Sequence, residues 1–420
     1  MIRRSRASIG VLFLLLCLAL SCRDVPGFDD CLRDIISPHE FDGLRWSVTR
    51  LMEGDHLLAD AIHWQPDDPA ACQVVLEYYA LIQEVGRARA EMMARGTLLD
   101  ESPEATDDDR LTSLTTQLDT IRDTVEWILA RQVRYVLNRE GIYNPLDRFA
   151  MIGFAFPPIN FDLERLPYTL IVSPRDRIES IREAMLVPDL TWDTIDLLEA
   201  QVEELNVSAL ALEIGGYGGT YPTLVADDTS LRYAVETVAE EWLHQYLAFT
   251  PLGFAYVLDL TRIAPDYRIA IMNETAAGII SGEIARVTLE TFCAEYAARE
   301  YSPREPTRPQ DAGRFDFNQA MRETRLTVDA MLAAGQIEEA EKYMEQRRLG
   351  IVAEGYWIRR LNQAYFAFYG TYADLPTSVD PIGETMRRLR QNSTSLRDFA
   401  NTVAAMGSYQ DLLAAEAALK

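Results

Sequence analysis

Apolar side chains recur at helical spacing along two long segments in the first third of the chain. The segment 73–95 carries them three and four residues apart up to Gly96, and a second segment runs from about Leu111 to Asn138, before Gly141. The polar stretch DESPEATDDD separates the two. Apolar residues at this spacing indicate amphipathic helices, and a short polar break favours antiparallel packing. The pattern therefore predicts a helical hairpin.

The pattern changes between residues 144 and 225, where short apolar runs alternate with proline and glycine. Tyr168 to Val172 is a compact β-forming run, and Val207 to Ile214 alternates as a half-exposed strand does. The segment 180–205 reads as helical pieces around Pro188. The stretch GGYGG (215–219) predicts a turn, because it lacks the Lys and Ser or Thr of a phosphate loop.

Helical spacing returns after a cluster of N-cap residues at 227–230. The first helix there contains VAEEWLHQYL (238–247), and after a loop around Pro251 and Pro265 a second begins near Ile269 and extends toward Glu290. Beyond the link SPREPTRPQDAG, the C-terminal third is helical in pattern. These elements predict a predominantly helical α+β protein, with a small β-sheet ahead of a helix pair. The predicted regions are 1–22, 23–143, 144–300 and 301–420.

The N-terminus has the layout of an export signal. Arg3, Arg4 and Arg6 precede an uncharged run that ends at Cys22, and this run is shorter than the ~20 residues a membrane-spanning helix needs. The residues ALSC (19–22) also resemble a bacterial lipobox, which implies lipidation of Cys22. We therefore expect an exported protein of the bacterial cell envelope, tethered to the membrane. A plain secretory signal and a short uncleaved anchor are the alternatives.

Composition narrows the range of partners. The chain has 420 residues, 48% of them hydrophobic, and a formal net charge of −25, so it should fold and should repel nucleic acid. Outside the cytoplasm cysteines can oxidise, and a Cys31–Cys72 pair would tie the N-terminal segment to the first long helix. Cys293 is then expected to be a buried, unreactive side chain.

One helix carries candidate chemistry. Glu240 and His244 lie four residues apart and so share a helix face with Glu241 nearby. In the HExxH helix of zinc proteases two histidines bind zinc and the glutamate between them is the general base. The next predicted helix contains an Asn273-Glu274 pair. Together these residues resemble the gluzincin metallopeptidases, the thermolysin-like and aminopeptidase group.

The resemblance covers Val207 to Gly282 and implies a set of roles. Glu240, His244 and Glu274 would bind Zn²⁺, and Glu241 would be the catalytic base of a peptide hydrolase acting on a peptide or protein substrate. The strand 207–214 would be the sheet edge that aligns an extended peptide. The segment 361–370 also resembles a pattern in uncharacterised bacterial envelope proteins.

The sequence departs from this family at Glu240, where the family has histidine. Two carboxylates and one imidazole place more negative charge on a metal, which makes its water less acidic and favours harder ions such as manganese. The alternatives are a degenerate relative that binds peptide or envelope protein without cleavage, an ordinary amphipathic helix without metal, and a purely structural lipoprotein.

Several weaker candidates remain. His39, His56 and His63 could complete the altered site from a distance, although an isolated histidine is more often structural. Glu53 and His56 form a second ExxH, as a di-iron bundle would need, but in a poor helix-forming context. Tyrosines at 365, 369 and 372 recur at helical spacing, and a tyrosine can stabilise an oxyanion, although an aromatic stripe is more often core.

Overall fold

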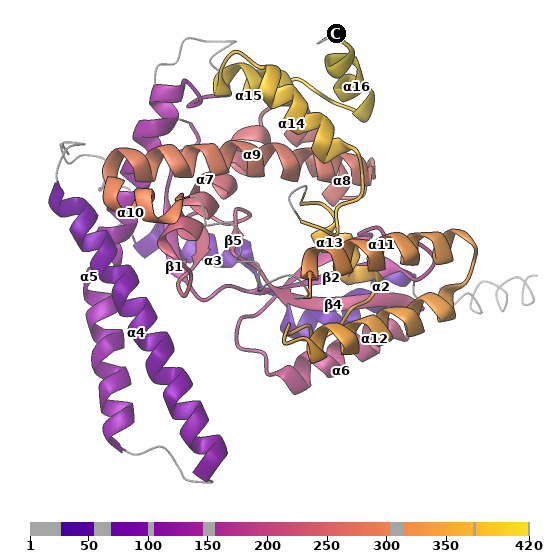
Figure 1. Cartoon of the computed structure of the whole chain (residues 1–420), viewed down its shortest axis with the longest axis horizontal. Coiled ribbons are helices and arrows are strands. Elements are labelled where there is room, and N and C mark those ends of the chain that lie inside the picture. Colours follow the sequence, from indigo (N-terminus) through magenta and orange to yellow (C-terminus); the bar gives the residue numbers. More distant parts are fainter. Residues whose placement is uncertain are drawn as a thin grey trace, which may run out of the picture.

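The N-terminal hairpin is the most extended part of the molecule. A computed structural model describes residues 27–53, 69–99, 105–145, 156–302, 315–372 and 375–418. Helices α4 (Pro69–Leu99) and α5 (Ala105–Glu140) run antiparallel and project from the body (Figure 1). Helix α5 ends at Gly141, whose φ of +73° is the left-handed conformation that glycine adopts freely. The predicted hairpin is confirmed, although α4 runs past Gly96, since one glycine costs a helix only ~1 kcal/mol.

Two small sheets lie in the middle of the chain. The first is antiparallel, in the order β3-β2-β4, and the second is mixed, in the order β1-β6-β5 with β1 parallel to β6. In the first sheet Leu170 stands opposite Ala184 on one side and Ala211 on the other. The strands are β1 (Phe161–Glu164), β2 (Tyr168–Pro174), β3 (Arg182–Leu186), β4 (Val207–Glu213), β5 (Gly216–Tyr217) and β6 (Thr223–Ala226).

Helices cover both faces of the β3-β2-β4 sheet. Helices α2 (Phe28–Ile36) and α6 (Trp192–Glu203) pack on one face, and α13 (Gln363–Tyr369) packs on the other. The first six residues of β4 are therefore buried, and the expectation of a half-exposed strand at 207–214 is wrong. The helical interpretation of 180–205 is also wrong in its first half, because residues 182–186 pair with β2 as a strand.

Two long helices form the centre of the core. Ser230 caps α7 (Leu231–Leu247) by accepting a hydrogen bond from the N–H of Tyr233, as the N-cap cluster predicts. Helix α9 (Tyr267–Phe292) packs along α7, and both bury apolar faces in the largest hydrophobic cluster. Between them lies α8 (Pro251–Leu260), in a segment that the sequence predicted as a loop.

The C-terminal third is helical, as predicted, and the predominantly helical α+β fold is confirmed. The boundaries predicted between the regions stay predictions. No helix in the described ranges is long and apolar enough to cross a membrane, and the export signal lies outside them. The remaining helices are η1 (Ser37–His39), α3 (Gly43–Glu53), α10 (Ala294–Glu300), α11 (Phe317–Ala333), α12 (Ile337–Ala353), α14 (Ile382–Asn392), α15 (Leu396–Ala404) and α16 (Tyr409–Ala418).

A disulfide joins distant parts of the chain, but not the predicted pair. Cys72 at the start of α4 is bonded to Cys293 after α9, with their Cα atoms 5.6 Å apart. Cys31 is not in this disulfide and lies on α2, which packs against α6 and the β3-β2-β4 sheet. The Cys31–Cys72 prediction is therefore wrong, as is the reduced Cys293, because the fold brings the start of α4 to the end of α9 and holds α2 elsewhere.

Candidate metal centre

Helices α7 and α9 bring three of the predicted site residues together. Glu240, His244 and Glu274 each offer a ligand atom, and these atoms all lie within 4.8 Å of one another. The Nε2 of His244 is 3.7 Å from Oε2 of Glu274. Ligands of a tetrahedral zinc ion stand about 3.3 Å apart, given bonds of about 2.0–2.1 Å. A small inward adjustment of these side chains would therefore form three corners of a metal site.

Asn273 fixes the orientation of the histidine. The Nδ1 of His244 lies 2.8 Å from Oδ1 of Asn273, whose side chain is fully buried. Because an amide oxygen only accepts hydrogen bonds, Nδ1 carries the proton and donates. Nε2 is thereby directed at Glu274. A histidine that ligates a metal generally has such a partner on its other nitrogen, which sets the tautomer.

Tyr256 on α8 holds the second carboxylate. Its hydroxyl donates a hydrogen bond of 2.8 Å to Oε1 of Glu274, and its ring centre is 6.2 Å from that of His244. The Oε2 atom is the one left facing the histidine. Tyr256 is absent from the residues that the sequence predicts, because Pro251 and its neighbours predict a loop; the helical spacing from Pro251 to Leu260 is the signal that could have revealed it.

The site concentrates acidic side chains, and their proximity and burial shift the pKa values of the group. Burial is the main cause that raises the pKa of Glu240 to about 8, and Glu274 adds to it against the opposing effect of His244. Burial works against a charged His244, but Glu274, Glu241 and Glu240 outweigh it and raise the pKa of this imidazole to about 8. Within the described ranges, no lysine or arginine forms an ion pair with Glu240, Glu241 or Glu274.

Glu241, the predicted base, is next to Glu240 on α7 but is not one of the three clustered ligands. Burial raises the pKa of Glu241 to about 7; His244 and a backbone hydrogen bond from Gly218 oppose this rise, and Glu274 adds to it. A Cβ at Gly216 would come within 2.5 Å of Oε1 of Glu241, and one at Gly218 within 2.8 Å of Oε2. The interpretation of GGYGG as a mere turn is therefore wrong: it contains β5 and gives Glu241 a close-fitting backbone cradle.

A cavity of about 200 Å³ adjoins Glu274. Tyr256, Tyr267 and Tyr372 line it together with Glu183 of β3. Burial and the charge of Glu274 keep the pKa of Tyr372 well above its ordinary value, so this hydroxyl stays protonated beside the acidic group. Of the three tyrosines singled out in the sequence, Tyr365 and Tyr369 contact each other on α13 with tilted rings, and Tyr372 lines the cavity beside Glu274.

The other histidines do not complete the group within the described part of the chain. His39 ends η1, where its carbonyl accepts from the N–H of Val187, and it is not among the clustered ligands. His56 and His63 lie outside the described residues. Glu53 is the last residue of α3, so the second ExxH also ends outside them.

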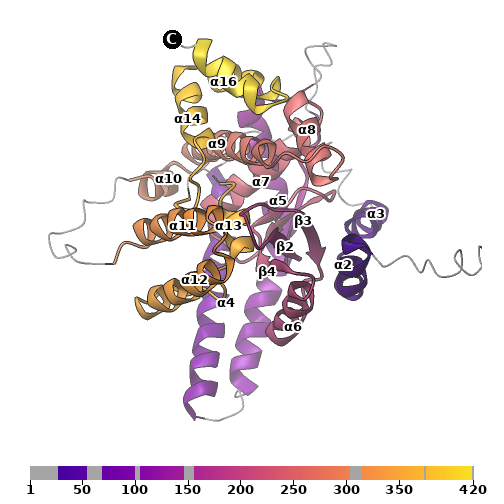
Figure 2. The same cartoon turned by 90° about the vertical axis from the view of Figure 1, so that its right-hand side faces the viewer.

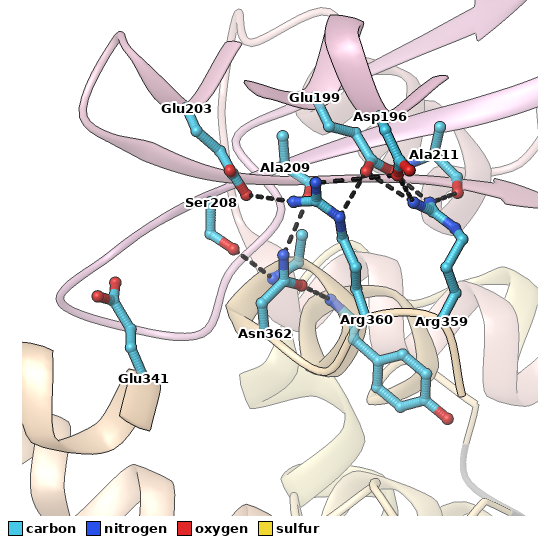
Figure 3. Close-up of polar contacts among 12 residues, drawn as sticks. Asp196, Glu199, Glu203, Ser208, Ala209, Ala211, Glu341, Arg359, Arg360 and Asn362 are labelled. Carbon is cyan, nitrogen blue, oxygen red and sulfur yellow. Dashed lines mark hydrogen bonds and ion pairs between the residues drawn. The ribbon is translucent and has the colours of Figure 1, made fainter. Parts of the chain in front are cut away.

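The strand that the family resemblance assigned to peptide alignment has no free edge. On the side of β4 away from β2, Arg359 donates to the carbonyl of Ala211 at 2.8 Å and Asn362 donates to that of Ala209 at 2.9 Å (Figure 3). The N–H of Ala211 donates to Glu199 at 2.7 Å. Side chains thus occupy the places that a peptide backbone would take, and β4 cannot align a peptide as implied.

The donor set fits a metal ion in number, proximity and chemistry. The Glu240–His244–Glu274 group can hold a metal ion, and its carboxylate-rich composition suits zinc or a harder divalent ion. Comparisons with protein-family models, with curated proteins and with solved structures find no match for this chain. The function of this protein is therefore inferred from the chemistry and geometry of the Glu240–His244–Glu274 group and its surroundings.

Proposed function

We propose that this protein is an exported, membrane-tethered zinc-dependent peptidase of gluzincin type. The observation that carries the proposal is the meeting of Glu240, His244 and Glu274 beside Glu241, with Asn273 directing the imidazole. The Cys72–Cys293 disulfide supports export, because such bonds persist mainly in oxidising compartments. The lipobox-like ALSC at 19–22 supports a lipid tether at the bacterial cell envelope.

The side chains have the properties that peptide hydrolysis requires. Zinc would supply a Lewis acid that polarises the scissile carbonyl and acidifies water. With a pKa raised to about 7, Glu241 would take a proton from the attacking water near neutral pH and pass it to the leaving amine. Tyr372 remains protonated, so its hydroxyl would donate to negative charge developing on the carbonyl oxygen.

A cleavage assay with one conservative substitution tests this proposal. The chain is loaded with zinc and incubated with a mixture of peptides, and products are identified by mass spectrometry. Glu241→Gln keeps the shape and the hydrogen bond from Gly218 but removes the base, so cleavage should fall by about 100-fold or more while metal content is unchanged. Equal cleavage by parent and variant would exclude Glu241 as the base.

The closed β4 edge favours a second candidate, a relative that binds a peptide or envelope protein without cutting it. The glutamate at position 240, where the resembled family has histidine, also favours this second candidate. Under this proposal the metal-loaded parent cleaves no peptide in the mixture, and Glu240→His increases metal affinity without creating activity. Cleavage by the parent would exclude it.

A further inference from the structure

Helix α8 exposes an apolar face beside the candidate site. Phe254, Val257 and Leu260 of α8 and Ile263 in the turn after it recur every three residues with 59%, 40%, 48% and 73% of their surface exposed. Asp259, the acidic residue of this helix, is buried on the opposite face and accepts the N–H of Asp266. Contiguous apolar exposure of this kind marks a contact with a partner or a membrane.

Helix α3 also exposes an apolar face. Leu44 and Met52 are 78% and 82% exposed, and Val48 and Leu51 lie between them with 48% and 41% exposed. These residues share one helix face by their spacing. Glu53, its last residue, is the only acidic residue within α3, which also carries Arg45 and Arg50. Both helices lie at the right-hand side of Figure 2, α8 above α3.

We propose that the α3 and α8 faces together seat the protein on a lipid bilayer. The chain outside the described residues ends next to them: Phe28 of α2 is six residues from Cys22, so a lipid on Cys22 would hold α2 within about 20 Å of the bilayer. The charge distribution agrees. Although the chain has a net charge of −25, α8 contains one acidic residue, the buried Asp259, and α3 contains one, Glu53, with the exposed Asp42 and Asp266 just outside the two helices.

The cavity beside Glu274 connects this face to the candidate metal centre. Leu260 belongs to the exposed stripe and also lines the cavity, together with Tyr256 and Arg262. A bilayer against α8 would therefore lie at one wall of the cavity. If the proposed function holds, the substrates are peptide segments at the membrane surface, such as lipid-anchored peptides or the ends of membrane proteins.

Vesicle flotation tests the membrane face without using metal or cleavage. A chain beginning at Arg23 keeps every described residue but lacks the signal and Cys22. It is floated with vesicles of phosphatidylethanolamine containing a minor share of phosphatidylglycerol. The pairs Phe254→Ser with Ile263→Ser and Leu44→Ser with Met52→Ser should each lower the vesicle partition constant by about tenfold or more.

The matched control replaces exposed apolar residues away from both faces. Leu349 on α12 and Trp357 after it are 54% and 86% exposed, and α12 lies on the other side of Figure 2. Leu349→Ser with Trp357→Ser should leave flotation unchanged. A parent chain that does not float, variants that float equally well, or a soluble dimer that the α3 and α8 variants dissociate would each overturn the proposal. Cleavage of soluble peptides is measured separately, so the two proposals can fail independently.

Discussion

Two groups of glutamates, one around the fully buried Glu199 and one around the half-buried Glu240, are compensated in opposite ways. Around the fully buried Glu199, Arg359 and Arg360 both form ion pairs, and the N–H of Ala211 donates to it as well (Figure 3). Around Glu240 and Glu274, His244 is the basic side chain at hand. The first group is paired with two arginines, whereas among the described residues the second has only the imidazole of His244 and no arginine or lysine in an ion pair. We therefore interpret the Glu199 group as a structural network and the group of Glu240 and Glu274 as a site that binds a cation.

The largest loss of stability is expected in the Glu199 group, where the charges are paired. Glu199→Ala would leave Arg359, Arg360 and the Ala211 N–H without their shared acceptor, and should lower the free energy of unfolding by about 3–5 kcal/mol. Glu203→Ala is the control, because this carboxylate is more exposed and, among the described residues, its ion pair is with Arg360, so the substitution should cost about 1 kcal/mol or less. Urea unfolding that ranks the two variants equally would refute the network.

Replacing a glutamate of the candidate centre should raise the free energy of unfolding, whereas replacing Glu199 should lower it. The pKa of Glu240 is about 8 in the folded chain against an ordinary 4.5, so folding holds its proton and metal-free stability is lost as pH rises from about 4.5 to about 8. Glu240→Gln cannot titrate, and at pH 8 in chelator it should be more stable than the parent by about 1–3 kcal/mol.

This gain should vanish below pH ~4.5, where the parent carboxyl is protonated in both states. Thermal unfolding followed across this range in the presence of chelator measures it. If the variant were less stable than the parent at pH 8, the charge of Glu240 would already be compensated within the protein. The contrast drawn between the Glu199 group and the candidate centre would then be wrong.

The role of Asn273 predicts a loss of metal affinity. Asn273→Ala frees the imidazole of His244 to turn, and zinc affinity should fall by about 10–100-fold. Thr275→Ala is the matched control on the same helix, because its buried hydroxyl makes no hydrogen bond in the structure. Calorimetric titration with zinc gives both values. If both variants lost the same zinc affinity, the cause would be disturbed packing of α9 and not the hydrogen bond from His244 to Asn273.

Tyr256 should have the smallest effect. Tyr256→Phe removes one hydrogen bond to Glu274, which corresponds to about 2–10-fold in zinc affinity. Tyr267→Phe lines the same cavity but donates to the carbonyl of Ala367 instead, and should leave zinc affinity unchanged. A larger effect at Tyr267 would place the ion elsewhere in the cavity.

The sequence predicted the parts of the site that depend on local pattern. Helices α7 and α9 follow from N-cap residues and helical periodicity, and that periodicity places Glu240 and His244 on one face. Tyr256 was missed because Pro251 and Gly253 at the start of α8 read as loop residues, although proline is tolerated in the first turn of a helix.

Long-range contacts could not be predicted in the same way. Arg359 meets Glu199 across 160 residues, and Cys72 meets Cys293 across 221, so neither pairing leaves a local pattern. Strand β3 was mistaken for helix because pairing with β2, rather than its own residues, decides its conformation. The closed edge of β4 follows from the same kind of contact, made by the segment before α13.

The measurement that bears most directly on a site awaiting a cation is the metal content of the purified chain. Native mass spectrometry would compare the parent with Glu274→Ala and with Glu240→His. The account predicts nearly one zinc or other divalent ion per parent chain, lost in Glu274→Ala and retained in Glu240→His. A parent that stays empty when excess zinc is supplied, while Glu240→His fills, would contradict it and show a centre that has lost its metal.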